Sequence, residues 1–112
     1  MIKVGIDIVN IDRIKKLIKK FGLKKLKFLN EDEFYTNKSE SIAGIFATKE
    51  AFSKALGTGI GKEFSFKDIS ILKDIKGKPF IKINSSKIKI KNCDISISHD
   101  GGFAIAAVIV EI

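Results

Sequence analysis

The feature that most constrains the fold is the run FAIAAVIV at 103–110, in which every residue is apolar. Its length and its β-branched content predict a strand. The residues Asp100-Gly101-Gly102 directly before it predict a turn. A strand this apolar is normally buried on both faces. A chain of 112 residues has few other elements with which to cover two faces, so we expect another subunit to cover one of them.

Length and composition predict a single domain over residues 1–112. Hydrophobic residues make up 45% of the chain and charged residues 30%, a balance that excludes a disordered protein. The single cysteine, Cys93, excludes a disulfide framework. No apolar segment has the roughly 20 residues that a membrane helix needs, and residues 1–9 lack the features of a signal peptide. We therefore expect a cytoplasmic protein that binds no membrane.

Alternating apolar residues predict strands at 2–9, from Phe64 to Ile71, at 80–83, at 88–90, at 95–98 and at 103–110. Helical spacing predicts one helix that begins after Asn10 or Asp12, and a longer one over about 41–56. The glycines Gly22 and Gly57 end them. Asn30 and Glu33 resemble a capping box at the start of a short helix. The expected fold is α+β, with a small antiparallel sheet packed against a long helix and a basic amphipathic helix.

The positive charge is concentrated in one segment. The chain has a net charge of +8, and eight basic residues with no acidic one lie between Arg13 and Lys27. This cluster predicts an acidic or phosphorylated partner, although a solvated lysine-rich surface has the same composition. A basic nucleic-acid-binding module without catalysis is the alternative function. It leaves the carboxylates described next unexplained, and the chain lacks the aromatic platform of single-strand binders.

Three polar clusters carry possible chemistry. Asp7 interrupts an apolar strand, Glu50 and Lys54 share one face of the long helix, and His99 follows the strand SIS. Each has an ordinary structural explanation as well: a solvent-facing carboxylate, an exposed ion pair and a residue beside a hairpin turn. Two carboxylates without a second histidine or a cysteine favour Mg²⁺ over Zn²⁺. With Lys54, His99 and the glycine-rich segment 57–61, they suit a site that binds a diphosphate.

Four motifs occur in a characteristic order: GIDIV (5–9) followed by Arg13, FATKEAFSKALGTGIG (46–61), GKP (77–79) and SISH (96–99). This combination resembles the holo-[acyl-carrier-protein] synthases, which are small 4′-phosphopantetheinyl transferases. The resemblance implies transfer of the 4′-phosphopantetheine group of coenzyme A to a serine of apo acyl carrier protein, with release of adenosine 3′,5′-bisphosphate. It also implies dependence on Mg²⁺, a role in fatty acid biosynthesis, and a homotrimer with its sites between subunits.

The resemblance also implies roles for individual residues. Asp7 and Glu50 are the implied Mg²⁺ ligands, and Glu50 and Lys54 are the implied catalytic residues, with Lys54 on the diphosphate. The acceptor of the serine proton stays open between Glu50 and a water ordered by the metal. The implied coenzyme A contacts are Ser53, Lys54, Gly57, Thr58, Gly59, Lys78, Pro79 and His99.

The basic helix is implied to face the acidic carrier protein through Arg13, Lys16 and Lys20. Three features depart from the family pattern, and the first is Asn10, where many members carry glutamate. Ile45 stands where many members carry arginine, which removes or replaces one phosphate contact, and residues 84–93 are too short and too interrupted by lysine for the helix that many members have there.

Overall fold

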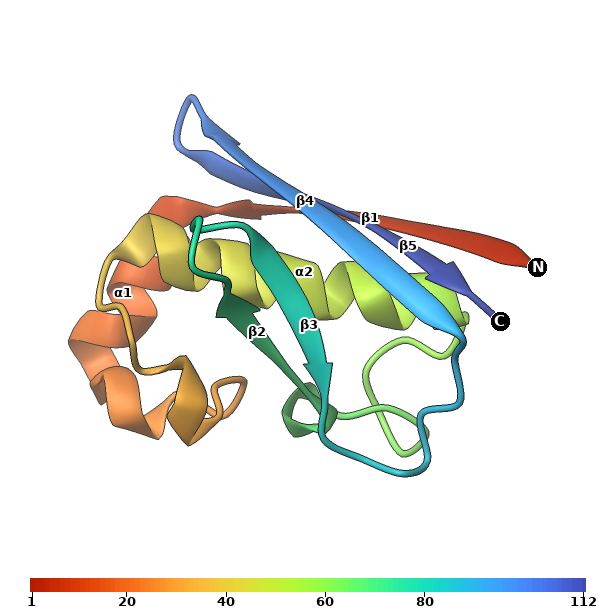
Figure 1. The fold of residues 1–112 in the computed structure, drawn as a ribbon. Helices are drawn as coiled ribbons and strands as arrows, with labels where there is room; N and C mark the ends of the chain where they lie inside the picture. Colours follow the sequence, from red (N-terminus) through yellow and green to blue (C-terminus); the bar gives the residue numbers. More distant parts are fainter.

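The computed structural model describes residues 1–112, and its central element is a three-stranded antiparallel sheet in the order β1-β5-β4. Its strands are β1 (Ile2–Asn10), β4 (Asn92–Asp100) and β5 (Phe103–Glu111). The long helix α2 (Ser39–Leu56) crosses one face of this sheet, and no element covers the other face (Figure 1). This arrangement confirms the predicted α+β fold. No helix combines the length and the apolar character needed to cross a membrane.

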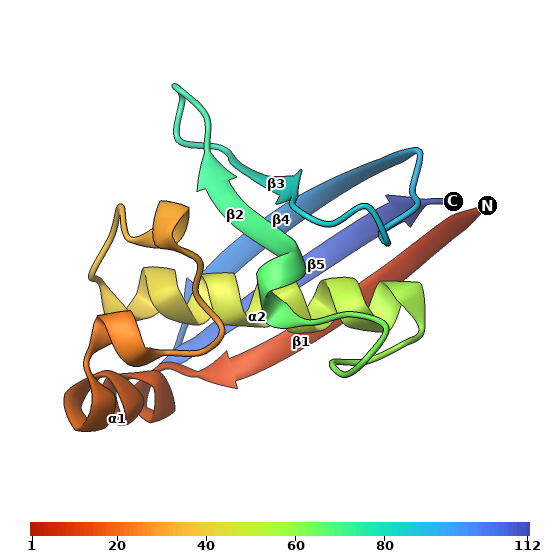
Figure 2. The same ribbon diagram turned by 90° about the horizontal axis from the view of Figure 1, so that it is seen from below.

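The helix α1 (Ile11–Phe21) follows β1 without a linker and lies at one end of α2 (Figure 2). The Asn10 side chain accepts hydrogen bonds from the backbone N–H groups of Asp12 and Arg13, so Asn10 is the N-cap. The helix ends at Gly22, as its sequence predicts. Two short 3₁₀ turns, η1 (Leu23–Lys25) and η2 (Glu31–Glu33), then lead to α2, and η2 contains the predicted capping box.

The strands β2 (Ile69–Lys73) and β3 (Pro79–Ile83) form a separate antiparallel hairpin, and β3 lies beside β4 (Figure 1). The predicted strand start at Phe64 is wrong. Phe64 is a core residue, and a 3₁₀ turn, η3 (Phe66–Asp68), precedes β2 because Asp68 accepts a hydrogen bond from the Ser65 backbone N–H. The predicted strand at 88–90 does not form either, because this segment has no neighbouring strand with which to pair.

The two faces of the sheet differ sharply in burial. In β5, Ala104, Ala106, Val108 and Val110 are buried under α2, whereas Phe103, Ile105 and Ile109 are exposed. The same alternation in β1 leaves four apolar residues on the uncovered face: Ile2, Val4, Ile6 and Ile8. The chain by itself therefore covers only one face of the apolar strand β5.

Gly5 sets how closely β1 approaches α2. A Cβ atom added at Gly5 would lie 1.8 Å from the Ala51 backbone oxygen, a distance that real Cβ atoms do not adopt. Only glycine permits this contact. Since Asp7 is two residues away and points to the same side of the strand, the close approach also brings Asp7 to α2.

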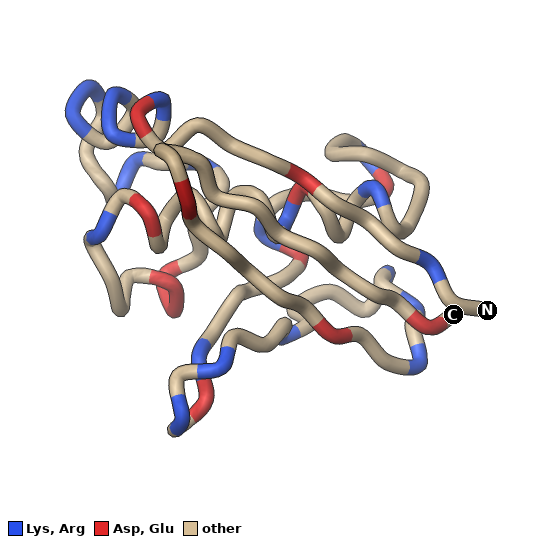
Figure 3. The backbone as a smooth tube through the Cα atoms, turned by 90° about the horizontal axis from the view of Figure 1, so that it is seen from above, with Lys and Arg blue, Asp and Glu red and all other residues tan.

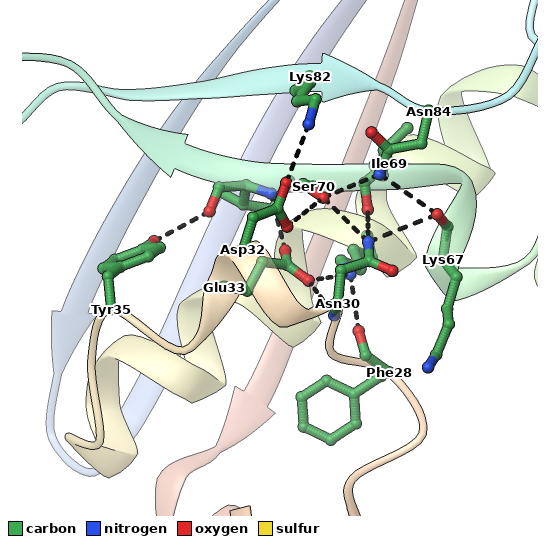
Figure 4. A network of polar contacts seen from close by, with 12 residues as sticks. Phe28, Asn30, Asp32, Glu33, Tyr35, Lys67, Ile69, Ser70, Lys82 and Asn84 are labelled. Carbon is green, nitrogen blue, oxygen red and sulfur yellow. Dashed lines mark hydrogen bonds and ion pairs between the residues drawn. The ribbon is translucent and has the colours of Figure 1, made fainter. Parts of the chain in front are cut away.

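A buried polar network ties α2 to the hairpin (Figure 4). Lys49 Nζ lies 2.6 Å from Glu33 Oε1 and 2.7 Å from the Phe28 carbonyl oxygen, and both charged side chains are fully buried. Glu33 also accepts hydrogen bonds from the backbone N–H groups of Asn30 and Ile71. Burial lowers the pKa of Lys49, while the adjacent Glu33 carboxylate acts in the opposite direction. One ion pair therefore connects α2, η2 and β2.

Further polar contacts surround this pair. The Asn30 side-chain amide donates to the Ile69 carbonyl oxygen, and the Ser70 hydroxyl donates to Asp32. Burial raises the pKa of Asp32, but hydrogen bonds from Ser70 and Lys82 outweigh it and hold that pKa below its ordinary value. Together these contacts satisfy the buried polar side chains, none of which lacks a hydrogen-bond partner.

Replacement of Gly5 by alanine tests the close approach of β1. We expect Gly5→Ala to lower the free energy of unfolding by about 2 kcal/mol or more, because the methyl group forces β1 away from α2. Denaturant-induced unfolding measures this loss. Gly61→Ala is the control, since nothing lies within 4 Å of a Cβ atom added there. Equal stability of the two variants would contradict the packing described here.

Tyr35 provides a spectroscopic test of the network. Its hydroxyl donates to the Ile71 carbonyl oxygen, and burial together with the Glu33 and Asp32 carboxylates raises its pKa to about 12. The chain has one tyrosine and no tryptophan, so phenolate absorbance reports on this group alone.

We expect a titration midpoint of about 12 in the folded protein and of about 10 in denaturant. The stabilisation associated with the neutral hydroxyl is complete below about pH 10 and is lost as the pH rises through about 12. A midpoint near 10 in the folded protein would contradict the burial and charge arrangement around Tyr35.

Candidate active site

The centre of the candidate site is an ion pair between β1 and α2. Lys54 Nζ lies 2.9 Å from Asp7 Oδ1 and 3.2 Å from the Ile6 carbonyl oxygen. Asp7 belongs to the edge strand β1, but it points towards α2 and its side chain is only 16% exposed. The simple explanation of a solvent-facing carboxylate is therefore wrong. The Lys54 side chain is 53% exposed, so this ammonium group faces solvent and is accessible to an anion.

Glu50 lies one helical turn before Lys54 on α2. Burial raises the pKa of Glu50, and the negative charge of Asp7 raises it further, while Lys54 and Arg13 act in the opposite direction. A carboxylate whose charge is disfavoured by a neighbouring carboxylate gains from a cation placed beside both. Asp7 and Glu50 therefore have the electrostatic relation expected of two carboxylates that share a cation.

The donor chemistry of this pair fits Mg²⁺. Both groups supply hard oxygen ligands, and Mg²⁺ is commonly held by one or two carboxylates, with water and substrate phosphate completing its shell. The chain contains no group of three or more His, Cys, Asp and Glu residues that could form a full protein shell. The residues present thus suit a metal that the substrate helps to hold.

Most backbone amides of the glycine-rich loop after α2 are engaged within the chain. Gly57 adopts the left-handed conformation and caps the helix, and the backbone N–H groups of Thr58 and Gly59 donate to the Ser53 carbonyl oxygen. These amides are therefore already used by the C-terminal end of α2. That end of a helix also carries partial negative charge. The amides of Gly57, Thr58 and Gly59 therefore form no anion cradle in the single chain, and contacts of these three residues with a substrate stay a prediction.

Ser53 is fully buried, and its hydroxyl donates to the Glu50 carbonyl oxygen at 2.7 Å. The structure of the single chain does not bring this side chain to an open surface. Its predicted contact with coenzyme A stays a prediction.

The remaining predicted coenzyme A residues lie at the other end of α2. His99 Nε2 is 2.9 Å from the Glu40 carbonyl oxygen. Because a carbonyl oxygen only accepts, Nε2 carries the proton in this contact. His99 and Pro79 line one pocket, whereas Lys78 is exposed and pairs with Asp94 at 2.9 Å.

The predicted site residues therefore form two separate groups in one chain. Asp7, Glu50 and Lys54 surround the C-terminal half of α2, and His99 lies beside Gly44 in its N-terminal half. Ten residues of helix between Gly44 and Lys54 correspond to about 15 Å. This division is compatible with a site that two chains share.

The basic residues of α1 form the third group and gather at one end of the molecule (Figure 3). Arg13 lies over the Phe46 ring, with its guanidinium carbon 5.7 Å from the ring centroid. Lys16 forms an exposed pair with Asp12 at 3.3 Å. Lys20 lies over the Phe21 ring. All three side chains remain available to a partner because they are exposed.

Sequence reasoning missed Lys49 and Glu33, the buried pair that fixes α2. A lysine directly before the candidate ligand Glu50 is a weak signal, and its partner is 16 residues away. Ile45, which the sequence analysis names as the position of a removed or replaced phosphate contact, lines the pocket beside His99 and Pro79. The side chain of Ile45 is buried and apolar, so it offers no phosphate contact in the place of the usual arginine.

Comparison with known proteins shows the family to which the chain belongs. A family model described as the 4′-phosphopantetheinyl transferase superfamily matches residues 3–108. The holo-[acyl-carrier-protein] synthase of Nautilia profundicola is 63% identical over 110 residues, which cover 96% of this chain and 97% of that protein.

Two crystal structures are also similar. Helicobacter pylori holo-[acyl-carrier-protein] synthase in complex with coenzyme A has a TM-score of 0.90 and 52% identity, over 96% of this chain and 99% of that chain. The Bacillus anthracis synthase in complex with coenzyme A (3′,5′-ADP) has a TM-score of 0.83 and 40% identity, over 97% and 95% of the two chains. The chain therefore belongs to the 4′-phosphopantetheinyl transferase superfamily and, within it, to the family of the holo-[acyl-carrier-protein] synthases.

Proposed function

We propose that this chain transfers the 4′-phosphopantetheine group of coenzyme A to a serine of apo acyl carrier protein and so supports fatty acid biosynthesis. The observation that carries the proposal is the group formed by Asp7, Glu50 and Lys54 on facing elements. Relatives that share the fold along nearly the full chain are holo-[acyl-carrier-protein] synthases. Coenzyme A and carrier protein are the proposed substrates, and the cytoplasm, where both occur, is the proposed location.

In the proposed reaction, the serine oxygen forms a bond to the phosphorus that carries the pantetheine arm. The bond from this phosphorus to the bridging oxygen of the diphosphate breaks, and adenosine 3′,5′-bisphosphate leaves with that oxygen. Lys54 binds the diphosphate, since its ammonium group is exposed at the site. The serine proton passes to Glu50 or to a water at the site, the two acceptors that the sequence leaves open.

Asp7 and Glu50 are the residues that would hold Mg²⁺. When bound, this ion would neutralise negative charge on the diphosphate. Asp7 has a second role that depends on the chain alone, because its carboxylate holds Lys54 at the surface of β1. Ser53, Gly57, Thr58, Gly59, Lys78, Pro79 and His99 remain the further proposed contacts of coenzyme A.

We also propose that three copies associate through the uncovered face of the sheet, with the sites between subunits. Support comes from the exposed isoleucine and valine residues of β1 and β5 on that face. The separation of Lys54 from His99 within one chain also supports a site shared between subunits. A neighbouring copy can supply the group around His99 to the group around Lys54.

The transfer reaction tests the proposed function directly. Incubation with coenzyme A, Mg²⁺ and apo acyl carrier protein should increase the mass of the carrier protein by one phosphopantetheine group. We expect Asp7→Ala and Glu50→Ala each to lower this turnover by about a hundredfold or more, and Glu50→Gln to be nearly as damaging. Glu31→Ala is the control, since Glu31 is an exposed carboxylate away from the site. Full activity of either alanine variant at ordinary Mg²⁺ would contradict the metal assignment.

Charge reversal tests the basic helix. Replacing Arg13, Lys16 and Lys20 by glutamate should raise the KM for carrier protein by about tenfold or more, because exposed charges steer an acidic partner. The KM for coenzyme A should change little. The wild-type KM for carrier protein should itself rise with ionic strength. The control variant replaces Lys67, Lys76 and Lys91 by glutamate. It changes the net charge by the same amount, but away from α1. If the first variant loses coenzyme A affinity instead, α1 belongs to the nucleotide site.

Light scattering tests the association. We expect a trimer for the wild type and a monomer with little activity for Ile109→Asp, because a buried carboxylate is costly at an apolar interface. Ile75→Asp should leave the trimer intact, since Ile75 is fully exposed at the tip of the β2–β3 hairpin. A fully active wild-type monomer would exclude a shared site.

A further inference from the structure

Arg13 of α1 lies over an aromatic ring that α2 supplies. Its guanidinium carbon is 5.7 Å from the centroid of the Phe46 ring, a separation typical of a cation–π contact. The contact joins the basic helix to the helix that carries Glu50. The Arg13 side chain is nevertheless exposed, so its guanidinium group can contact the Phe46 ring and a partner at the same time.

Two other aromatic rings hold the Phe46 ring in place. Its centroid lies 4.9 Å from that of Phe28, edge to face, and 5.7 Å from that of Phe66, in a stacked arrangement. Phe28 is buried, and the other two rings pack against the core. Aromatic pairs at these separations favour defined relative orientations. The core therefore fixes the surface on which Arg13 lies.

The other cation–π contact of the basic helix lacks this support. Lys20 Nζ lies 5.1 Å from the centroid of the Phe21 ring, but Phe21 is 48% exposed and stacks on no other ring. Both residues also belong to α1, so their contact ties the lysine to no second element. Of these two cations, only Arg13 is held by a ring that is itself fixed.

Arg13 is also the only arginine among the 21 lysine and arginine residues of the chain. A planar guanidinium can stack on a ring and still offer two N–H groups to one carboxylate, whereas a lysine ammonium acts as a point charge. Phe46 lies one helical turn before Glu50. Burial raises the pKa of Glu50, and the charge of Arg13 acts against this rise, so the guanidinium group lies near the candidate site.

We infer that Phe46 is a positioning residue, whose ring holds the Arg13 guanidinium group in the orientation that binds a carboxylate of the acidic carrier protein. The inference rests on the proposed function, because carrier protein is taken as the partner of α1. An arginine side chain loses conformational freedom when it binds, and one already held on a ring loses less. Phe46 therefore acts through Arg13 and not by contact with either substrate.

The test measures the KM for carrier protein and the KM for coenzyme A in the transfer reaction. Phe46→Leu keeps an apolar side chain but removes the ring. It should raise the KM for carrier protein by about fivefold and leave kcat and the KM for coenzyme A unchanged. Phe46→Tyr keeps the ring and should retain the wild-type values.

Phe66→Leu is the matched control, since it removes a ring of the same cluster that does not lie under Arg13. It should lower the free energy of unfolding as Phe46→Leu does, but leave both KM values unchanged. Arg13→Lys tests the same contact without a change in the core. It keeps the charge, loses the stacked guanidinium group and should raise the KM for carrier protein in the same way.

A double-mutant cycle separates positioning from a merely structural role. In the Arg13→Ala background, Phe46→Leu should have little further effect on the KM for carrier protein. An equal increase in both backgrounds would overturn the inference, as would the same increase in Phe66→Leu or an unchanged KM in Phe46→Leu or Arg13→Lys. Transfer by the wild type would then leave the proposed function standing, whereas a wild type that transfers nothing would overturn both.

Discussion

The buried ion pair between Glu33 and Lys49 is the interaction on which the rest of the structure depends. The Glu33 carboxylate accepts from Lys49 of α2, from the backbone of η2 and from the backbone of β2. Removal of one partner from a buried pair typically costs about 3–5 kcal/mol, because the other charge stays buried without compensation. The pair therefore fixes the position and rotation of α2 relative to the hairpin.

This rotation determines where the candidate chemistry lies. Glu50 follows Lys49 and points about 100° away around the helix, so locking Lys49 against η2 directs Glu50 towards β1. The close contact at Gly5 then sets the distance of β1 from α2 and presents Asp7 to Lys54. The candidate site is thus a consequence of packing on two sides of one helix. A change in either packing contact alters the geometry between Asp7 and Glu50.

Local patterns predicted most elements because the physical cause of each is local. Helical spacing and a terminal glycine predicted α2 to within two residues at its start, and the Asn10 cap marked the beginning of α1. Alternation predicted that β1 has two faces, but not that its isoleucine face would be uncovered. That outcome depends on Gly5 and α2, which are far apart in the sequence. The Glu33–Lys49 pair escaped prediction for the same reason, since it forms only in the tertiary arrangement.

The proposed association of copies accounts for both the uncovered apolar face and the divided site. A sheet that exposes Ile2, Val4, Ile6 and Ile8 on one side gains free energy when another copy covers it, at about 25 cal/mol for each Å² of apolar surface removed from water. Gly5, Asp7 and Val9 occupy the opposite side of β1, where Gly5 permits the close approach of α2. The strand that supplies Asp7 to the candidate site thus also supplies the surface for the proposed association. In that proposal, assembly of copies and assembly of the site are linked through the two faces of β1.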